Sequence, residues 1–132
     1  MNHKKQAYEQ IERTVKWNEI RGNTTDTLDW KLEIDMLQEE LNELALAVNK
    51  KDNVGIFDAL MDLEFVLRGS CGKFGLTPRM QVDGYEEVIS ANETKSSSKN
   101  AQGKITKPKD FVGPEKNLQK ILDERRTDGV QN

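Results

Sequence analysis

Acidic side chains at helical spacing are the residues of this sequence that could do chemistry. Asp58 and Asp62 are four residues apart, and Glu40 and Glu43 are three apart, so each pair projects from one helix face on adjacent turns. Burying a carboxylate without a partner costs several kcal/mol, and like charges one turn apart repel each other. The aspartates nevertheless lie among apolar neighbours, namely Val54, Ala59, Met61, Phe65 and Val66. We therefore expect a cation beside them.

A bound metal ion is the simplest source of that positive charge. Arg68 and Lys73 are the only basic residues between Asp52 and Pro78. Four carboxylates, with few nitrogen or thiol ligands nearby, match Mg²⁺ or Mn²⁺ rather than zinc. The competing interpretation is that glutamate-rich helix faces are usually only solvated, and it applies most strongly to Glu40 and Glu43 taken alone.

The composition excludes several other kinds of site and partner. The chain of 132 residues has a single Cys and a single His, which rules out a Ser-His-Asp triad with a well-placed base and a Cys/His zinc site. Lys and Arg total 20 against 23 Asp and Glu, for a net charge of −3, so nucleic acid is not an expected partner. No apolar run approaches the length of a membrane span. We expect a cytoplasmic protein that does not bind membranes.

The elements that must position the carboxylates are helices. We predict one all-α domain over residues 1–132, an antiparallel helix bundle with a mobile loop at about 95–112, and helices at about 4–20, 27–49, 54–69, 83–94 and 114–124. The short turn at 50–53 implies that the second and third helices are antiparallel, so the glutamates face the aspartates. The predicted seam between these helices consists of Ile34, Leu37, Leu41, Leu44 and Val48 with Ile56, Leu60, Leu63 and Leu67.

The apolar content is low for a lone globule. Hydrophobic residues make up 35% of the chain and charged residues 33%. Such a balance suits helices that complete their burial against another copy of the chain.

Several further residues are candidates for contacts with a substrate. Asn92 and Lys95 share the end of one predicted helix and could bind phosphate or base. Lys73 and Arg79 could contact phosphate, and Trp17 or Trp30 could stack on a base. For the tryptophans the alternative is burial in a core or interface. The lysines of the 95–112 loop could close over a ligand or could simply keep the loop soluble; they are Lys104, Lys107 and Lys109.

The segments QEELNEL at 38–44 and FDALMDLEFVLRG at 57–69 resemble the paired acidic motifs of the MazG-like all-α nucleoside triphosphate pyrophosphohydrolases. SANETK at 90–95 and GKITKPKDFVGPEKNLQKIL resemble the C-terminal signature of phage and bacterial members. The resemblance covers about residues 17–122. One departure is that the second motif of the family begins with Glu, whereas Ala59 and Gly55 stand three residues before Asp62 and Asp58.

The resemblance implies Mg²⁺-dependent hydrolysis of a nucleoside triphosphate, most simply a dNTP, to a monophosphate and pyrophosphate. Glu40, Glu43, Asp58 and Asp62 would bind the metal, and Glu39 is the candidate general base. Asn18 is a further substrate-binding candidate because it lies in the matching stretch. Family members form homodimers or homotetramers. The missing glutamate leaves open a non-catalytic helical protein that binds a nucleotide or metal.

Overall fold

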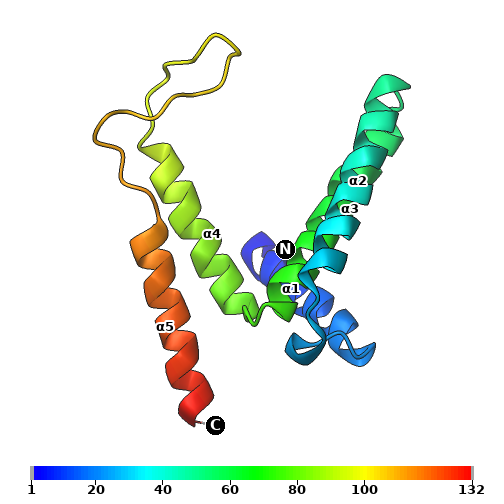
Figure 1. Cartoon of the computed structure of the whole chain (residues 1–132), viewed down its shortest axis with the longest axis vertical. Helices are drawn as coiled ribbons and strands as arrows, with labels where there is room; N and C mark the ends of the chain where they lie inside the picture. Colours follow the sequence, from blue (N-terminus) through cyan, green and yellow to red (C-terminus); the bar gives the residue numbers. More distant parts are fainter. Residues whose placement is uncertain (1, 132) are drawn as a thin grey trace. The chain divides into compact units, whose positions relative to one another are not determined.

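The part of the chain that the structure describes is entirely helical. This computed structural model describes the backbone of residues 2–131 and the side chains of residues 2–124. Its elements are α1 (His3–Ile20), the short 3₁₀ helix η1 (Thr25–Thr27), α2 (Trp30–Asn49), α3 (Asn53–Lys73), α4 (Pro78–Glu93) and α5 (Glu115–Gln131) (Figure 1). Within these residues no β-strand forms, only an isolated bridge between Lys99 and Ile105. The all-α prediction is confirmed, and the chain divides into two compact units, Met1–Pro78 and Arg79–Asn132.

A tight turn makes α2 and α3 an antiparallel pair, which Figure 1 shows side by side. Lys51 adopts a left-handed conformation with φ of 57°, and the Asp52 N–H donates back to the Ala47 carbonyl at 3.0 Å. This is the hydrogen-bond pattern that commonly ends a helix. The Asp52 side chain then accepts a hydrogen bond from the Gly55 N–H at 3.0 Å and so caps the N-terminus of α3. One residue thus ends one helix and begins the next.

The seam between α2 and α3 differs from the one predicted. The least exposed positions of α2 follow Glu33, Leu37, Glu40, Leu44 and Ala47, and those of α3 follow Ala59, Leu63, Val66, Ser70 and Lys73. The predicted seam was wrong in rotation, because Ile34, Leu41 and Val48 remain 60%, 49% and 55% exposed. These residues flank the seam on one side and stay exposed because, among the described elements, α2 packs only against α3.

A buried ion pair explains how a glutamate can occupy this seam. The Lys73 ammonium lies 2.6 Å from Oε1 of Glu33, and the Ser70 hydroxyl donates to the same oxygen at 2.9 Å. Glu33 is 1% exposed and Lys73 7%. An unpaired charge at this depth would be strongly unfavourable, so each residue depends on the other. The pair joins the first turn of α2 to the last turn of α3.

Helix α1 packs against the C-terminal half of α3. The Trp17 and Phe65 rings meet edge to face with centroids 5.2 Å apart, and Ile11 is buried. Gly69 and Gly72 of α3 lie beneath α1, which explains why α3 continues past the predicted end at residue 69 to Lys73. The glycines serve close packing between helices here and do not end the helix.

The second unit contains the fourth and fifth helices and the loop between them. Helix α4 begins at Pro78, five residues before the prediction, because proline is well suited to the first position of a helix. The α4 residue Glu87 accepts a hydrogen bond from Asn117 of α5 at 2.9 Å. Helix α5 extends to Gln131, beyond the predicted end near 124. Among the described residues, no helix is long and apolar enough to cross a membrane.

Removing one partner of the buried ion pair is expected to destabilise the fold strongly. Glu33→Ala should lower the free energy of unfolding by about 3–5 kcal/mol, because it leaves the Lys73 ammonium buried and unpaired. The double variant Glu33→Met with Lys73→Met should recover most of that loss. Urea denaturation measures these changes.

The exposed pair between Lys31 and Asp35 on the same helix is the matched control. Lys31→Ala should change the free energy of unfolding by less than about 1 kcal/mol. A double variant no more stable than Glu33→Ala would contradict the assigned role of the pair.

Candidate functional site

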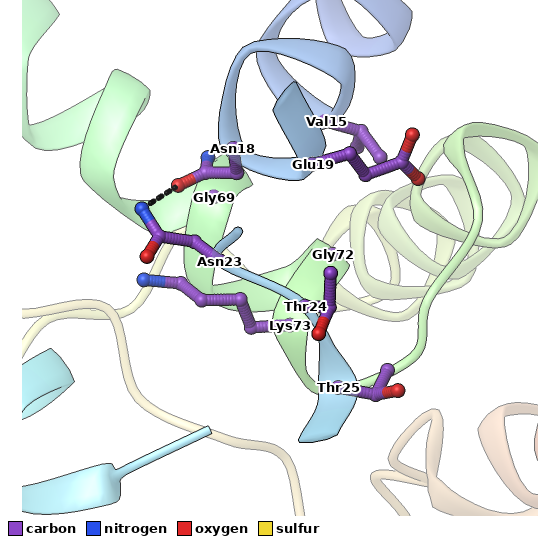
Figure 2. Close-up of a pocket in the computed structure, with 9 residues that line it drawn as sticks. All are labelled: Val15, Asn18, Glu19, Asn23, Thr24, Thr25, Gly69, Gly72 and Lys73. Carbon is purple, nitrogen blue, oxygen red and sulfur yellow. Dashed lines mark hydrogen bonds between the residues drawn. The ribbon is translucent and has the colours of Figure 1, made fainter. Parts of the chain in front are cut away.

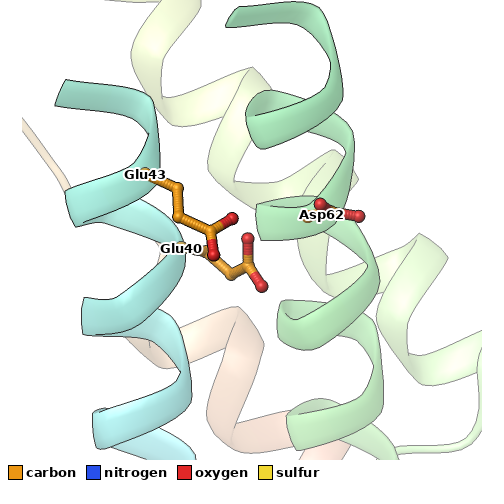
Figure 3. A group of neighbouring side chains, drawn as sticks. All are labelled: Glu40, Glu43 and Asp62. Atoms are coloured by element: carbon orange, nitrogen blue, oxygen red, sulfur yellow. The ribbon is translucent and has the colours of Figure 1, made fainter. Parts of the chain in front are cut away.

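Three carboxylates converge between α2 and α3, and we refer to Glu40, Glu43 and Asp62 as the acidic cluster. Each offers one carboxylate oxygen, and these three oxygens lie within 4.8 Å of one another. Figure 3 shows Glu40 and Glu43 extending from α2 toward α3, which carries Asp62. Three of the four predicted metal-binding residues therefore meet, as the antiparallel pairing of the two helices requires.

The electrostatics of the cluster favour protonation or a cation. Oε2 of Glu40 is buried and has no hydrogen-bond partner among the described residues. Burial raises the pKa of Glu40, and the neighbouring carboxylates of Glu43, Asp62 and Glu39 raise it further. Burial also raises the pKa of Asp62, with added repulsion from Asp58 and Glu43. Both groups thus resist ionisation in the absence of a positive charge.

No basic side chain in the described part of the chain forms an ion pair with the acidic cluster. The two basic residues of this region have other partners: Lys73 pairs with Glu33, and Nε of Arg68 lies 3.2 Å from Glu64. An orphaned buried oxygen among converging carboxylates fits a hard divalent cation, because such ions take oxygen ligands. The donor set thus suits the metal that the sequence predicts.

Asp58 and Glu39 lie at the edge of the cluster. Asp58 is exposed, one turn before Asp62 on α3, and falls outside the set of oxygens within 4.8 Å. It is still close enough to raise the pKa of Asp62. Glu39 is exposed on α2 and raises the pKa of Glu40. Both carboxylates are therefore accessible to water beside the cluster.

Local packing explains why neither residue 55 nor residue 59, the two positions that could carry the glutamate of the second family motif, is a glutamate. Ala59 is 3% exposed and fills the α2–α3 seam with a methyl group. A side chain at Gly55 would place its Cβ 2.5 Å from the Asp52 carboxylate that caps α3. A glutamate at residue 55 would therefore disturb the cap of α3. At residue 59 the alanine adds no carboxylate to the seam. The cluster has three converging acids instead of four.

Two of the predicted substrate-binding residues, Asn18 and Lys73, line one cavity of about 350 Å³ between α1, η1 and α3. We call it the polar cavity; Figure 2 shows the Asn18 amide, the Asn23 amide and the Lys73 ammonium gathered at one end of it. Trp17 lies elsewhere, with its ring against Phe65 and with the Arg21 guanidinium 4.1 Å from its ring centroid.

Asn92 and Lys95 belong to the second unit, where local contacts hold both. The Asn92 amide donates to the Val88 carbonyl at 2.8 Å, within its own helix. The Lys95 ammonium lies 5.4 Å from the ring centroid of Phe111, and the Lys107 ammonium lies 5.5 Å from the same centroid. Two cations thus flank one aromatic ring in the loop region.

Sequence reasoning missed Glu33 and Asn23. The signal for Glu33 was its spacing of two helical turns from Glu40, which puts both on one face of α2. No local pattern marks Asn23, because its amide reaches Asn18 at 3.4 Å only after the chain turns at the end of α1.

We expect Glu40→Gln to be more stable than the wild type near pH 7 in a chelating buffer. Since the folded-state pKa of Glu40 is raised, its protonated form favours the fold; that contribution is complete at low pH and is lost as the pH rises through the folded-state pKa. The difference between the two proteins should therefore shrink toward about pH 4. Urea titrations at several pH values measure it, and a difference independent of pH would contradict the assigned burial of Glu40.

Comparison with known proteins identifies the family. Residues 10–92, more than half of the chain, match the sequence profile of the family described as phosphoribosyl-ATP pyrophosphohydrolase. No curated protein and no solved structure matches the chain. The match covers α2 and α3 with the complete acidic cluster. The chain belongs to the phosphoribosyl-ATP pyrophosphohydrolase family, within the MazG-like all-α nucleoside triphosphate pyrophosphohydrolase superfamily, and is accordingly a hydrolase of acid anhydrides.

Proposed function

We propose that this protein hydrolyses a nucleoside triphosphate, a dNTP in the simplest case, to the monophosphate and pyrophosphate with Mg²⁺, and that it serves to clean the nucleotide pool. Membership of the family implies pyrophosphohydrolase activity on a nucleotide-like substrate. One observation supports a metal-dependent reaction: Glu40, Glu43 and Asp62 converge, and no basic side chain among the described residues forms an ion pair with them. Mn²⁺ has the same preference for oxygen ligands and is an alternative ion.

The acidic cluster would hold the ion, with Asp58 available from the adjacent turn. When bound, a divalent ion neutralises phosphate oxygens and favours attack on phosphorus. As general base, Glu39 would accept a proton from the attacking water, and its exposure beside the cluster supports this role. The new bond joins the water oxygen to the α-phosphorus, and the bond from that phosphorus to the bridging oxygen breaks, so pyrophosphate leaves.

The substrate contacts are proposed from chemistry and local environment. The Lys95 ammonium carries a charge that suits phosphate, and the Asn92 amide can donate hydrogen bonds on the same helix end. Trp17 remains a candidate for stacking, since it is 41% exposed. The loop at 95–112 remains a candidate lid.

A second candidate function is nucleotide or metal binding without turnover. The observation that favours it is Ala59, which leaves three converging carboxylates at the site. Fewer bound ions would neutralise less of the phosphate charge and hydrolysis would be slower, whereas binding needs only an ion and its ligands.

We also propose that two copies associate through an apolar stripe on α2 and α3. The stripe combines Ile34, Leu41 and Val48 with Leu60 and Leu67, all between 45% and 60% exposed. The Trp30 and Phe74 rings, with centroids 5.7 Å apart, join the two helices at one end of this side. The spacing of seven residues along each helix is that of helices which pack in bundles.

A second copy of the same helix pair is the occupant that fits this stripe. A two-fold axis brings the stripe of one chain against the same stripe of the other, and the four helices then bury both stripes. The Arg68–Glu64 pair lies on α3 and can form part of a polar rim. A homodimer is the smallest such assembly, and a homotetramer would require a further surface.

With Mg²⁺ and a panel of dNTPs and rNTPs, we expect the monophosphate and pyrophosphate as products, separated by ion-exchange chromatography. Asp62→Asn and Glu40→Gln should each lower kcat/KM by about 10²-fold or more, because each removes a carboxylate from the cluster.

Asp35→Asn is the matched control for that assay, since Asp35 lies on α2 in an exposed pair with Lys31. It should leave kcat/KM unchanged. Orthophosphate as the sole phosphate product, or full activity in both cluster variants, would refute the proposed reaction. Binding of a non-hydrolysable analogue without turnover of any nucleotide would favour the binding function.

Introducing a charge into the apolar stripe should disrupt the dimer. Leu41→Glu is expected to shift the mass measured by light scattering from that of two chains to that of one. Leu32→Glu is the control, because Leu32 is similarly exposed at 52% but lies on another side of α2. A wild-type protein with the mass of one chain would contradict the proposed association.

A further inference from the structure

The polar cavity is lined by amides, hydroxyls and the Lys73 ammonium, whose charge is neutralised by Glu33. Its polar lining comes from the end of α1, the following turn and α3, and includes Asn18, Asn23, Thr24, Thr25 and Lys73. Asn18 is 7% exposed, donates to the Thr14 carbonyl at 3.2 Å and accepts from Asn23 at 3.4 Å. The buried Asn18 amide, held in this way, presents its donor and acceptor groups in fixed positions.

The charge balance indicates what the cavity does not bind. Among the described residues that line the cavity, the one cation is Lys73, which is paired with Glu33 at 2.6 Å, and the one other charged residue is the acidic Glu19. A phosphate in this cavity would have to displace Glu33 from Lys73 and leave a buried carboxylate unpaired, which is strongly unfavourable. An uncharged ligand with its own donors and acceptors avoids that cost.

Two glycines of α3 allow α1, with the Asn18 amide, to approach closely. A Cβ at Gly69 would meet Nδ2 of Asn18 at 2.8 Å, and one at Gly72 would meet Val15 at 3.2 Å. Each glycine within a helix lowers helix stability by about 1 kcal/mol relative to alanine. The two glycines therefore destabilise α3 but permit this close approach. The amide is therefore packed directly on the backbone of α3 at the cavity wall.

The cavity and the acidic cluster lie along one helix. Gly69 follows Asp62 by two helical turns, or about 10 Å, on nearly the same face of α3. That separation is comparable to the length of a nucleotide from its α-phosphate to its base. One ligand could therefore contact both places.

We propose that the polar cavity binds the base of the nucleotide and that Asn18 and Asn23 determine which base is accepted. The proposal rests on the proposed function for the identity of the ligand. Asparagine suits this role because its amide both donates and accepts, as the hydrogen-bonding edges of bases do. Lys73 acts here as part of a neutral wall and makes no contact with phosphate.

The first experiment separates base binding from hydrolysis. Isothermal titration calorimetry in a chelating buffer measures the binding of the common nucleosides, which carry no phosphate. We expect one nucleoside to bind preferentially, and Asn18→Ala and Asn23→Ala each to weaken its binding by about tenfold or more. Glu43→Gln should leave nucleoside binding unchanged, because the acidic cluster would contact only the phosphates.

The second experiment measures base preference in catalysis. The ratio of kcat/KM between the best and the other triphosphates should fall toward one in Asn23→Ala, while product identity stays the same. Asn42→Ala is the control, since Asn42 pairs with Gln38 on the exposed side of α2. Asn23 is the main variant because it lies in a turn, whereas Asn18 is buried and its replacement also changes packing. Urea denaturation confirms that each variant is folded.

The outcomes distinguish this inference from the proposed function. Nucleoside binding that depends on Asn23, in a protein that hydrolyses no nucleotide, would support base binding in the polar cavity and refute the proposed hydrolysis. Hydrolysis with an unaltered base preference in folded Asn23→Ala, or no measurable nucleoside binding by the wild type, would overturn the cavity assignment. Inorganic phosphate binding that Asn23→Ala abolishes and Asp62→Asn does not would also overturn it.

Discussion

The ion pair between Glu33 and Lys73 is the interaction on which the arrangement of the first unit depends. It connects the first turn of α2 to the last turn of α3, at the opposite end from the turn at Lys51 and Asp52. The two helices are therefore fixed at both ends, one by backbone conformation and one by charge. Because both partners are buried, the pair tolerates little displacement, and the register of α2 against α3 follows from it.

That register accounts for two features on different sides of the helix pair. It places Glu40 of α2 opposite Asp62 of α3, so that carboxylates from separate helices share one space. It also leaves Ile34, Leu41 and Val48 outside the seam, where they form an exposed apolar stripe. A seam centred on Ile34, Leu41 and Val48 would have covered this stripe and turned Glu40 toward solvent. The seam set by Glu33 and Lys73 thus brings the carboxylates together on one side of the helix pair and leaves the apolar stripe exposed on the other.

Much of the fold could be predicted from the sequence, because helix periodicity, capping residues and a short turn are local signals. The helices α1, α2 and α3 and their antiparallel connection follow from these signals. The rotation of α2 against α3 could not be predicted, since it depends on a pair of charges forty residues apart in the chain. The beginning of α4 at Pro78 was missed because proline marks both the end of a loop and the start of a helix.

The acidic residues at 40, 43 and 62 could be identified for the same reason, since helical spacing and an antiparallel turn suffice to bring them together. The expectation that Asp58 belongs to the cluster depended on which face of α3 meets α2, and the sequence does not determine that rotation. Asn18 was singled out through resemblance, whereas its contact with Asn23 arises from the turn after α1. Contacts made by irregular segments leave no periodic trace in a sequence.

The methyl group of Ala59 has a consequence for the association of α2 with α3. Because this residue contributes no negative charge to the seam, the helices bring together fewer mutually repelling groups when they first associate. The helix pair therefore brings three carboxylates together where a glutamate at residue 59 would add a further negative charge, and less repulsion opposes the association of α2 with α3.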